Sequence, residues 1–219
     1  ERLTKRYGRV LLGRDRNAQT DDQEDRRGWE RWLTDHAFKL DERRYDEWAR
    51  LLRFSAAGTL AEQAPAGRAH SGQVLGEFTL TDTALSVEGA GSTAATDNGE
   101  SQSSGDGVVR LKSGDTLQVA LTWLADRQPE ANYTAFLQLL DAGSQVKAQT
   151  DRWPGDGLYP TGALQAGQVI TDRVALPLNV PAGNYELIAG LYRGDAAGTP
   201  RLTGPGGDHV VLATVKVEP

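Results

Sequence analysis

Residues 116–124 spell Thr-Leu-Gln-Val-Ala-Leu-Thr-Trp-Leu, and this stretch decides the class of the fold. Its apolar side chains recur at every second position, at Leu117, Val119, Leu121 and Trp123. This alternation places them on one face of a β-strand, whereas a helix would need a period of about 3.6 residues. The three residues before it, Ser-Gly-Asp, have the composition of a turn. The sequence therefore predicts a half-buried strand with Trp123 in the core.

Short strands of the same kind continue on both sides of this stretch. The pattern predicts strands at 73–80 and 84–87, around a Thr-Asp-Thr turn, and at 108–111, 133–140, 145–150, 168–176, 185–192 and 210–217. Clusters of Gly, Pro, Asn and Asp separate them, with no amphipathic helical stretch in between. Many short strands joined by turns are typical of a β-sandwich, of jelly-roll or immunoglobulin-like type. We therefore predict a mainly β fold for residues 73–219.

One segment of this region has a different composition. Residues 89–107 contain 14 Gly, Ala, Ser or Thr among 19 residues, and no apolar side chain larger than alanine. Such a segment cannot bury enough surface to offset the entropy lost on ordering. We therefore expect a long disordered loop at 89–107.

The first 54 residues differ from the rest in charge. They carry 14 Lys/Arg and 12 Asp/Glu, a net charge of +2, whereas residues 55–219 carry 10 and 18, a net charge of −8. Residues 55–72, which are rich in Ala, Gly, Ser and Pro, have the composition of a linker. The sequence therefore predicts a separate segment at 1–54, a linker at 55–72 and the sandwich at 73–219.

The N-terminal segment contains one clear helix. Trp29, Trp32, Leu33 and His36 follow helical spacing, and Thr20 with Gln23 forms a capping box. We expect a helix over 22–38, preceded by a strand at 9–12. The apolar run at 48–54 fits a strand or a helix, so residues 1–54 resemble a small α/β unit. Packing is the expected role of Trp29, Trp32 and Trp48, with His36 against the tryptophans.

Composition excludes several classes of function. The mean hydropathy is −0.50 and the apolar runs are short, so no membrane span is expected. A net charge of −6 argues against a nucleic-acid partner. The absence of cysteine excludes disulfides, thiol catalysis and zinc–thiolate sites. The chain starts at Glu1 and contains no methionine, which indicates a piece of a longer protein.

An ordered series of motifs over residues 133–193 suggests a family. The series comprises Leu139-Leu140-Asp141, Ala148-Gln149, Asp151, Pro154, Gly157, Tyr159-Pro160-Thr161, Gly167, Ile170, Asp172, Leu176-Pro177, Pro181, Gly183, Tyr185 and Gly190-Leu191-Tyr192. It resembles the C-terminal extracytoplasmic domain of bacterial multi-pass membrane glycosyltransferases of the dolichyl-phosphate-mannose and aminoarabinose transferase type. Residues 1–54 are similar to the end of the α/β region that precedes this domain. The tryptophan usual before Gly167 is absent here, where Leu164 lies nearby.

This resemblance implies a location and a role. The chain would lie on the periplasmic or cell-surface side, attached to the membrane through upstream segments. The catalytic acids of those transferases lie in other loops, so no catalytic residue is transferred to this sequence. The resemblance implies a non-catalytic part, without a cofactor, that positions an acceptor glycan or docks a membrane-protein partner. The alternative is a structural or interaction subunit of a cell-surface or membrane-associated assembly.

The candidate contact residues are Asp151, Arg152, Trp153 and Tyr159. Trp153 lies in a Pro/Gly-rich loop, where no periodicity requires its burial. An exposed aromatic ring can stack on a sugar while neighbouring charged groups bind its hydroxyls. The alternative is that this loop folds back and caps one end of the sandwich.

Enzymatic and metal sites have weaker support. The acids Asp141, Asp151, Asp156 and Asp172 could form a glycosidase pair, but Asp141 and Asp156 lie in turn sequences. The three histidines are far apart and show no metal-binding spacing. We therefore predict no catalytic residue and no metal site in this segment.

Overall fold

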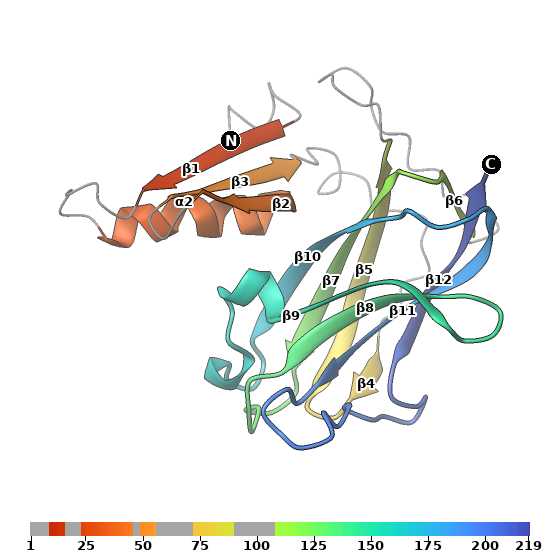
Figure 1. Cartoon of the computed structure of the whole chain (residues 1–219). Helices are drawn as coiled ribbons and strands as arrows, with labels where there is room; N and C mark the ends of the chain where they lie inside the picture. The colour runs from red at the N-terminus through yellow and green to blue at the C-terminus, as the bar shows by residue number, and fades with distance from the viewer. Residues whose placement is uncertain (1–8, 16–22, 46–48, 56–71, 90–107) are drawn as a thin grey trace.

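A computed structural model describes residues 9–15, 23–45, 49–55, 72–89 and 108–219. Two sheets pack face to face in it, which confirms the predicted β-sandwich (Figure 1). The first sheet has the order β1 (Arg9–Asp15), β3 (Ala49–Ser55), β2 (Phe38–Arg44), β10 (Val169–Pro177), β7 (Thr116–Ala125), β5 (Phe78–Glu88) and β4 (Gln73–Leu75). The second has the order β6 (Val108–Lys112), β12 (Val210–Glu218), β11 (Gly183–Tyr192), β8 (Thr134–Leu140) and β9 (Val146–Arg152).

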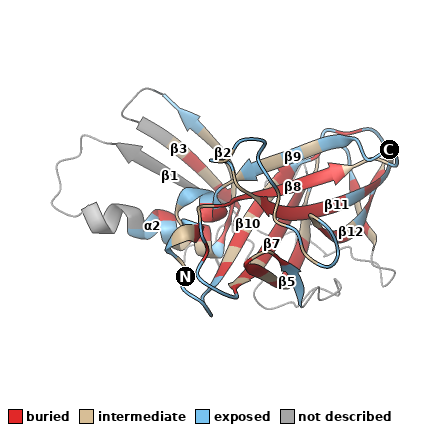
Figure 2. Ribbon diagram, turned by 90° about the horizontal axis from the view of Figure 1, so that it is seen from below, coloured by how far each residue is buried: buried red, intermediate tan, exposed pale blue. Residues whose placement is uncertain are grey.

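The core lies between the sheets, as the alternation in β7 predicts. Leu117, Val119, Leu121 and Trp123 are all buried, and they pack in one cluster with apolar residues of β8, β10, β11 and β12. Figure 2 shows this buried layer along β7, β8 and β11. Each large apolar side chain removed from water contributes about 1.5–3 kcal/mol, so the two facing layers hold the sandwich together.

One predicted turn is wrong. The residues Thr81-Asp82-Thr83 do not separate two strands, because β5 runs through them with an irregular register against β7 between Leu80 and Asp82. The chain reverses earlier, at Gly76 and Glu77, between β4 and β5. Gly76 has a φ of 58°, which glycine adopts at little cost.

The N-terminal elements differ from the prediction in one place. The helix α2 spans Gln23–His36 and gives way to β2, which the sequence did not reveal because its residues Lys39–Arg44 are mostly charged. Of the two alternatives for 48–54, the strand is observed, as β3. The strand predicted at 9–12 is confirmed as β1, which pairs with β3.

The aromatic residues of α2 only partly match the prediction. The His36 ring stacks on Trp32 with centroids 4.5 Å apart, as expected. Trp32 packs at the edge of the small cluster formed by Leu33, Ala37, Leu52 and Phe54. Trp29, however, is 58% exposed, so its predicted role in packing is wrong. Trp29 lies one helical turn before Leu33, beyond the residues that form this cluster, and Trp48 lies outside the described residues.

The N-terminal strands and the sandwich share one sheet. β2 lies parallel to β10, with Lys39 opposite Val174. At the start of β2, Phe38 is fully buried against Ala84, Ala120 and Ala175. These alanines face away from the inter-sheet core, so Phe38 covers the outer face of the β5–β7–β10 sheet. The division at 55–72 stays a prediction; residues 56–71 and 90–107 lie outside the described part of the chain.

Candidate functional site

The connection between β9 and β10 holds Trp153 and Tyr159, two of the predicted contact residues. It contains two short 3-10 turns, η1 (Pro154–Gly157) and η2 (Thr161–Ala163). Gly155 has a φ of 62°, and a Cβ added there would lie 2.2 Å from the ring of Tyr159, so glycine is required. The Thr161 hydroxyl accepts a hydrogen bond of 2.7 Å from the backbone N–H of Tyr133. The connection is therefore tied down at the end of the sandwich, as the capping alternative proposed.

Arg152 is used inside the sandwich. Its Nη2 donates to Oδ1 of Asp172, which is fully buried, over 3.0 Å. The backbone N–H of Gly155 donates to the same oxygen over 2.9 Å. Removing one partner of a buried ion pair destabilises a protein by about 3–5 kcal/mol. Arg152 therefore anchors the connection to β10.

Tyr159 also makes an internal contact. Its hydroxyl donates to Asp35 of α2, and Lys39 of β2 pairs with Asp156 of η1. Burial raises the pKa of Tyr159, and the hydrogen bond to Asp35 raises it further. The connection is thus the place where the N-terminal elements attach to the sandwich.

Asp151 lies on a different face of β9 from Arg152, and Trp153 is exposed just past the end of the strand. Side chains alternate along β9, so Gln149 and Asp151 face outward while Arg152 faces the other sheet. Trp153 follows directly after β9, with backbone angles of φ −66° and ψ 139°. Trp153 is 45% exposed. The structure therefore separates the four predicted residues into two outward and two internal ones.

The outer face beside Asp151 carries a polar network that the sequence did not reveal. Arg201, in the connection between β11 and β12, lies with its guanidinium carbon 4.3 Å from the centroid of the Phe136 ring. Its Nη2 donates to Oε1 of Gln138 over 3.1 Å, and Gln138 donates to Gln149 over 3.2 Å. A guanidinium held over an aromatic ring and by an amide has a fixed orientation.

Two further contacts complete this network. Arg201 pairs with Asp208 over 3.3 Å, and His209 Nδ1 lies 2.7 Å from the same carboxylate. The hydrogen bond with His209 lowers the pKa of Asp208; partial burial opposes this effect and the charge of Arg201 adds to it. We call the surface formed by Phe136, Gln138, Gln149, Asp151, Trp153, Tyr192, Arg201, Asp208 and His209 the polar face.

Asp151 belongs to the polar face through Tyr192. Desolvation raises the pKa of the Asp151 carboxyl, while a hydrogen bond from Tyr192 and the charge of Arg201 act in the opposite direction. Below these side chains, a Cβ on Gly190 would lie 2.4 Å from the Phe136 ring, so this glycine makes room for the ring. The polar face thus offers a carboxylate, amides, a guanidinium and an exposed indole on one sheet.

A signal for part of the polar face was present in the sequence. Phe136 and Gln138 share one strand face, as do Gln149 and Asp151, but the apolar run around them hides the alternation in β8. Arg201 lies in a Gly/Pro-rich connection without periodicity. Its contact with β8 depends on tertiary structure alone.

Asp141 has a local structural role. Asp141 accepts hydrogen bonds from the N–H groups of Gly143 and Gln145, as expected of a turn residue. Within the described ranges, no group of three or more His, Asp or Glu could hold a metal ion. In the same residues, no helix has the length and apolarity needed to cross a membrane.

Comparisons with known proteins show low similarity. No protein-family model matches the sequence, and no curated protein matches it. The solved C-terminal domain of Wzt has a TM-score of 0.39 and 13% identity over 73% of this chain and 89% of that one. A β-glucuronidase from glycoside hydrolase family 2 has a TM-score of 0.30 and 14% identity over 47% of this chain and 9% of that one. The putative ApaA protein from Bordetella pertussis has a TM-score of 0.29 and 12% identity over 67% of this chain and 98% of that one. No functional conclusion follows from similarity at this level.

Proposed function

We propose that this chain is a non-catalytic, extracytoplasmic part of a membrane glycosyltransferase-like protein, and that its polar face holds an acceptor glycan. The motif series at 133–193 supports the family context. The observation that carries the binding role is the exposure of Trp153, which is half exposed and follows directly after the edge strand β9, two residues beyond Asp151. On this account, the face binds a glycan and does no bond-making chemistry.

The chemistry of the polar face suits a carbohydrate. An indole ring packs against the apolar C–H face of a sugar ring, and its exposed area at Trp153 is available for this contact. Carboxylate and amide oxygens accept hydrogen bonds from hydroxyl groups, while amide N–H and guanidinium groups donate to them. Asp151, Gln149 and Arg201 supply these groups.

The geometry of the polar face suits a chain of sugars. Side chains on one face of a strand repeat at intervals of about 6.5–7 Å, so Gln149 and Asp151 form a row along the edge strand β9, and Trp153 follows just past its end. Arg201 lies beside this row on the same outer face, over the neighbouring strand β8, where Phe136 and Gln138 hold it. Because Phe136 and Gln138 hold the Arg201 guanidinium in place, Arg201 loses little side-chain entropy when a ligand binds.

A matched pair of tryptophan variants tests the proposal. Tetrasaccharides of mannose, glucose, galactose and arabinose are titrated into the full chain by isothermal titration calorimetry. We expect at least one to bind, with Trp153→Ala weakening its affinity about tenfold, the effect of losing an aromatic contact of about 1–1.5 kcal/mol. Trp29→Ala, which removes the exposed indole of α2, should leave the affinity unchanged. Equal affinity of Trp153→Ala and wild type would refute the proposal.

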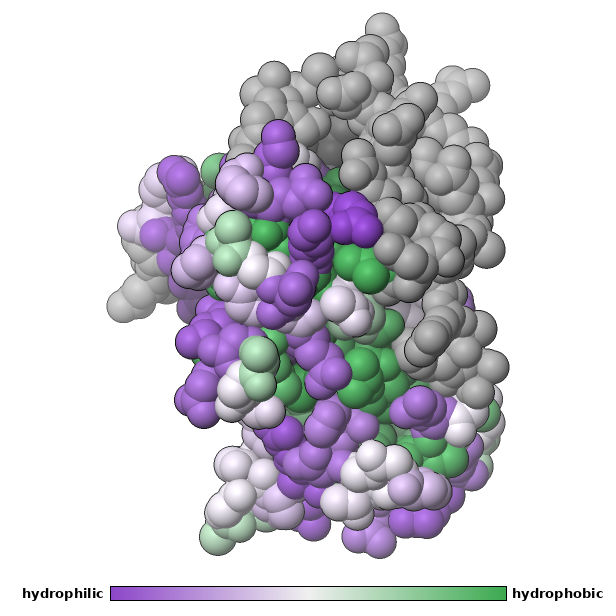
Figure 3. Space-filling view, turned by 90° about the vertical axis from the view of Figure 1, so that its right-hand side faces the viewer, coloured by the Kyte–Doolittle hydropathy of each residue, from purple (hydrophilic) through white to green (hydrophobic). Residues whose placement is uncertain are grey.

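A second candidate function is favoured by the surface outside the polar face. Trp29 is exposed and lies edge-on to Trp32, with centroids 6.3 Å apart. Figure 3 shows hydrophobic surface in the middle of one side of the molecule, with hydrophilic residues to its left. Exposed apolar patches of this kind mark protein interaction sites. Size-exclusion chromatography with mass spectrometry of the native source would reveal a complex if the chain is an interaction subunit.

A further inference from the structure

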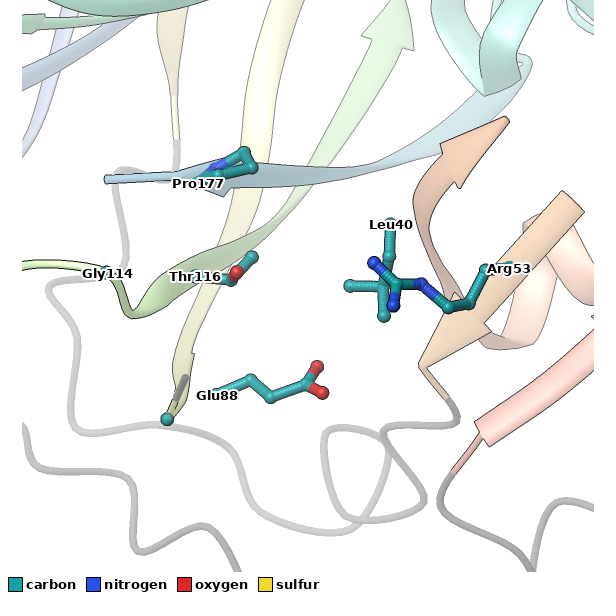
Figure 4. Close-up of a pocket in the computed structure, with 7 residues that line it drawn as sticks. Leu40, Arg53, Glu88, Gly114, Thr116 and Pro177 are labelled. Carbon is teal, nitrogen blue, oxygen red and sulfur yellow. The ribbon is translucent and has the colours of Figure 1, made fainter. Parts of the chain in front are cut away.

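Charged groups around the cavity on the first sheet are already paired. Residues of β2, β3, β5, β7 and β10 line this cavity, as Figure 4 shows. Arg53 pairs with Asp41, and Glu88 accepts a hydrogen bond from Gln118. The polar face, on the second sheet, is different because one of its polar atoms is accessible and has no partner among the described residues.

That atom is Nε2 of His209. The other ring nitrogen, Nδ1, lies 2.7 Å from Oδ1 of Asp208. Within the described part of the chain, Nε2 makes no hydrogen bond, and it is not a buried atom. The His209 side chain is 32% exposed, so a ligand on the polar face can reach Nε2.

Asp208 fixes the position of the proton on this ring. The hydrogen bond with His209, with the charge of Arg201, holds the pKa of Asp208 below its ordinary value, so its carboxylate is ionised at neutral pH. An ionised carboxylate can only accept, so the hydrogen of this bond belongs to Nδ1. A neutral imidazole has one donor and one acceptor, and Nε2 is therefore the acceptor.

The register of the sheet relates this acceptor to Asp151. Phe136 lies opposite Asp151 on β9 and opposite Gly190 on β11, so these three residues form a line across the strands. Asp208 lies over Gly190, with its backbone oxygen 3.2 Å from the position of an added Cβ. Adjacent strands are about 4.8 Å apart, so the line from Asp151 to Gly190 is about 10 Å long.

A donor lies between the two ends of this line. Arg201 covers the Phe136 ring and donates to Gln138. The line therefore has an acceptor at Asp151, a guanidinium in the middle and a second acceptor at His209. Hydroxyl groups both donate and accept, so a chain of sugar rings can match this order.

We infer that Nε2 of His209 accepts a hydrogen bond from a hydroxyl group of the bound glycan, which lies across β9, β8 and β11. This inference rests on the proposed function and adds to it a residue that selects the ligand. A sugar hydroxyl donates to Nε2, whereas an ether oxygen or a carboxylate at the same place has no proton to donate. His209 therefore favours a glycan with a free hydroxyl group at this position.

Nitrogen-15 NMR of the histidine rings tests the acceptor role directly. The labelled full chain is measured at pH 8, where imidazole groups are ordinarily neutral, alone and with a tetrasaccharide that binds in calorimetry. We expect His209 to carry its proton at Nδ1 in the free chain, and its Nε2 signal to move on binding. A proton at Nε2 in the free chain, or an unmoved Nε2 signal at saturation, would overturn the inference.

Two substitutions separate hydrogen bonding from packing. His209→Asn keeps an N–H for Asp208 but lacks an acceptor at the position of Nε2, so we expect tetrasaccharide affinity to fall about threefold to tenfold. His209→Gln can place its amide oxygen near that position and should bind more tightly than His209→Asn. His36→Asn is the matched control, because His36 lies on α2 and its loss should leave the affinity unchanged. Equal losses in both His209 variants would indicate a structural role and contradict the inference.

Trp153→Ala distinguishes this inference from the proposed function. If Trp153→Ala weakens tetrasaccharide binding and His209→Asn binds like wild type, the glycan site stands and the role of His209 is wrong. If no tetrasaccharide binds, both proposals are wrong.

Discussion

The two outer faces of the sandwich are covered in opposite ways. On the β5–β7–β10 sheet, three alanines leave a shallow apolar surface, and the fully buried ring of Phe38 lies on it. On the β8–β9–β11 sheet, the buried Phe136 ring is covered by a guanidinium within a network of polar side chains. The first face is occupied by another part of the same chain, and the second presents groups that can bind a ligand.

This contrast indicates which surfaces of the sandwich are available for recognition. Small side chains let another element approach closely, and burial of Phe38 then makes the contact stable. On the other face, Asp151 is exposed and Arg201 is partly exposed, so a ligand can reach their polar groups. The three predictions that follow test this contrast.

Phe38→Ala tests the apolar face and has the largest expected effect. It removes a fully buried aromatic ring from the contact with Ala84, Ala120 and Ala175. We expect the free energy of unfolding to fall by about 3–5 kcal/mol, measured by urea denaturation. Hydrogen exchange should accelerate in β2 more than in β8.

A conservative variant at the same position serves as its control. Phe38→Leu keeps an apolar side chain and should cost less than about 1.5 kcal/mol if the neighbouring side chains repack. If Phe38→Ala changes stability by less than this control, the ring does not hold the N-terminal strands on the sandwich.

Gly190→Ala tests the packing beneath the polar face. The added Cβ would lie 2.4 Å from the Phe136 ring and 3.2 Å from the backbone oxygen of Asp208, so the ring must move. We expect a loss of about 1–3 kcal/mol by thermal unfolding and a displaced Arg201. Gly206→Ala is the matched control, because no atom lies within 4 Å of its added Cβ. Its effect should stay within about 0.5 kcal/mol, and an equal loss in both variants would argue against close packing under Arg201.

The pH dependence of the polar face is the smallest expected effect. The pKa of Asp208 lies below its ordinary value of 3.8, chiefly through the hydrogen bond with His209. An acid with a lowered pKa in the folded state stabilises the protein above its unfolded pKa, and this contribution disappears as the pH falls through the folded pKa. Thermal unfolding measured from pH 5 downward should show that the wild type loses a small amount of stability below about pH 3.8. The Asp208→Asn variant should lack this loss. A loss of the same size in both proteins would place the acid sensitivity elsewhere.

The sequence predicted the sandwich well because its strands are half buried. The alternation from Leu117 to Trp123 depends only on which face of β7 meets the core, and this requirement is local. The strand β2 was missed because one residue, Phe38, makes its apolar contact and charged residues follow. The bulge in β5 was missed because Thr-Asp-Thr is equally typical of a turn.

The candidate site was predictable only in part, for a related reason. The exposure of Trp153 followed from its Pro/Gly-rich surroundings, and the structure has it half exposed. The partners of Arg152 and Tyr159 lie at Asp172 and Asp35, on other elements, so no local pattern could reveal them. The position of Arg201 over Phe136 depends on the path of the β11–β12 connection. Local periodicity predicts burial, whereas pairings distant in sequence need the fold.

Chemical-shift mapping of the full, isotope-labelled chain tests the central claim most directly. A tetrasaccharide that binds in calorimetry is titrated, and backbone amide and tryptophan indole signals are followed. The account predicts shifts concentrated at residues 136–138, 149–153, 192 and 201, including the indole N–H of Trp153. Shifts confined to α2 or to the side of the molecule in Figure 3, with the indole of Trp153 unmoved, would contradict it.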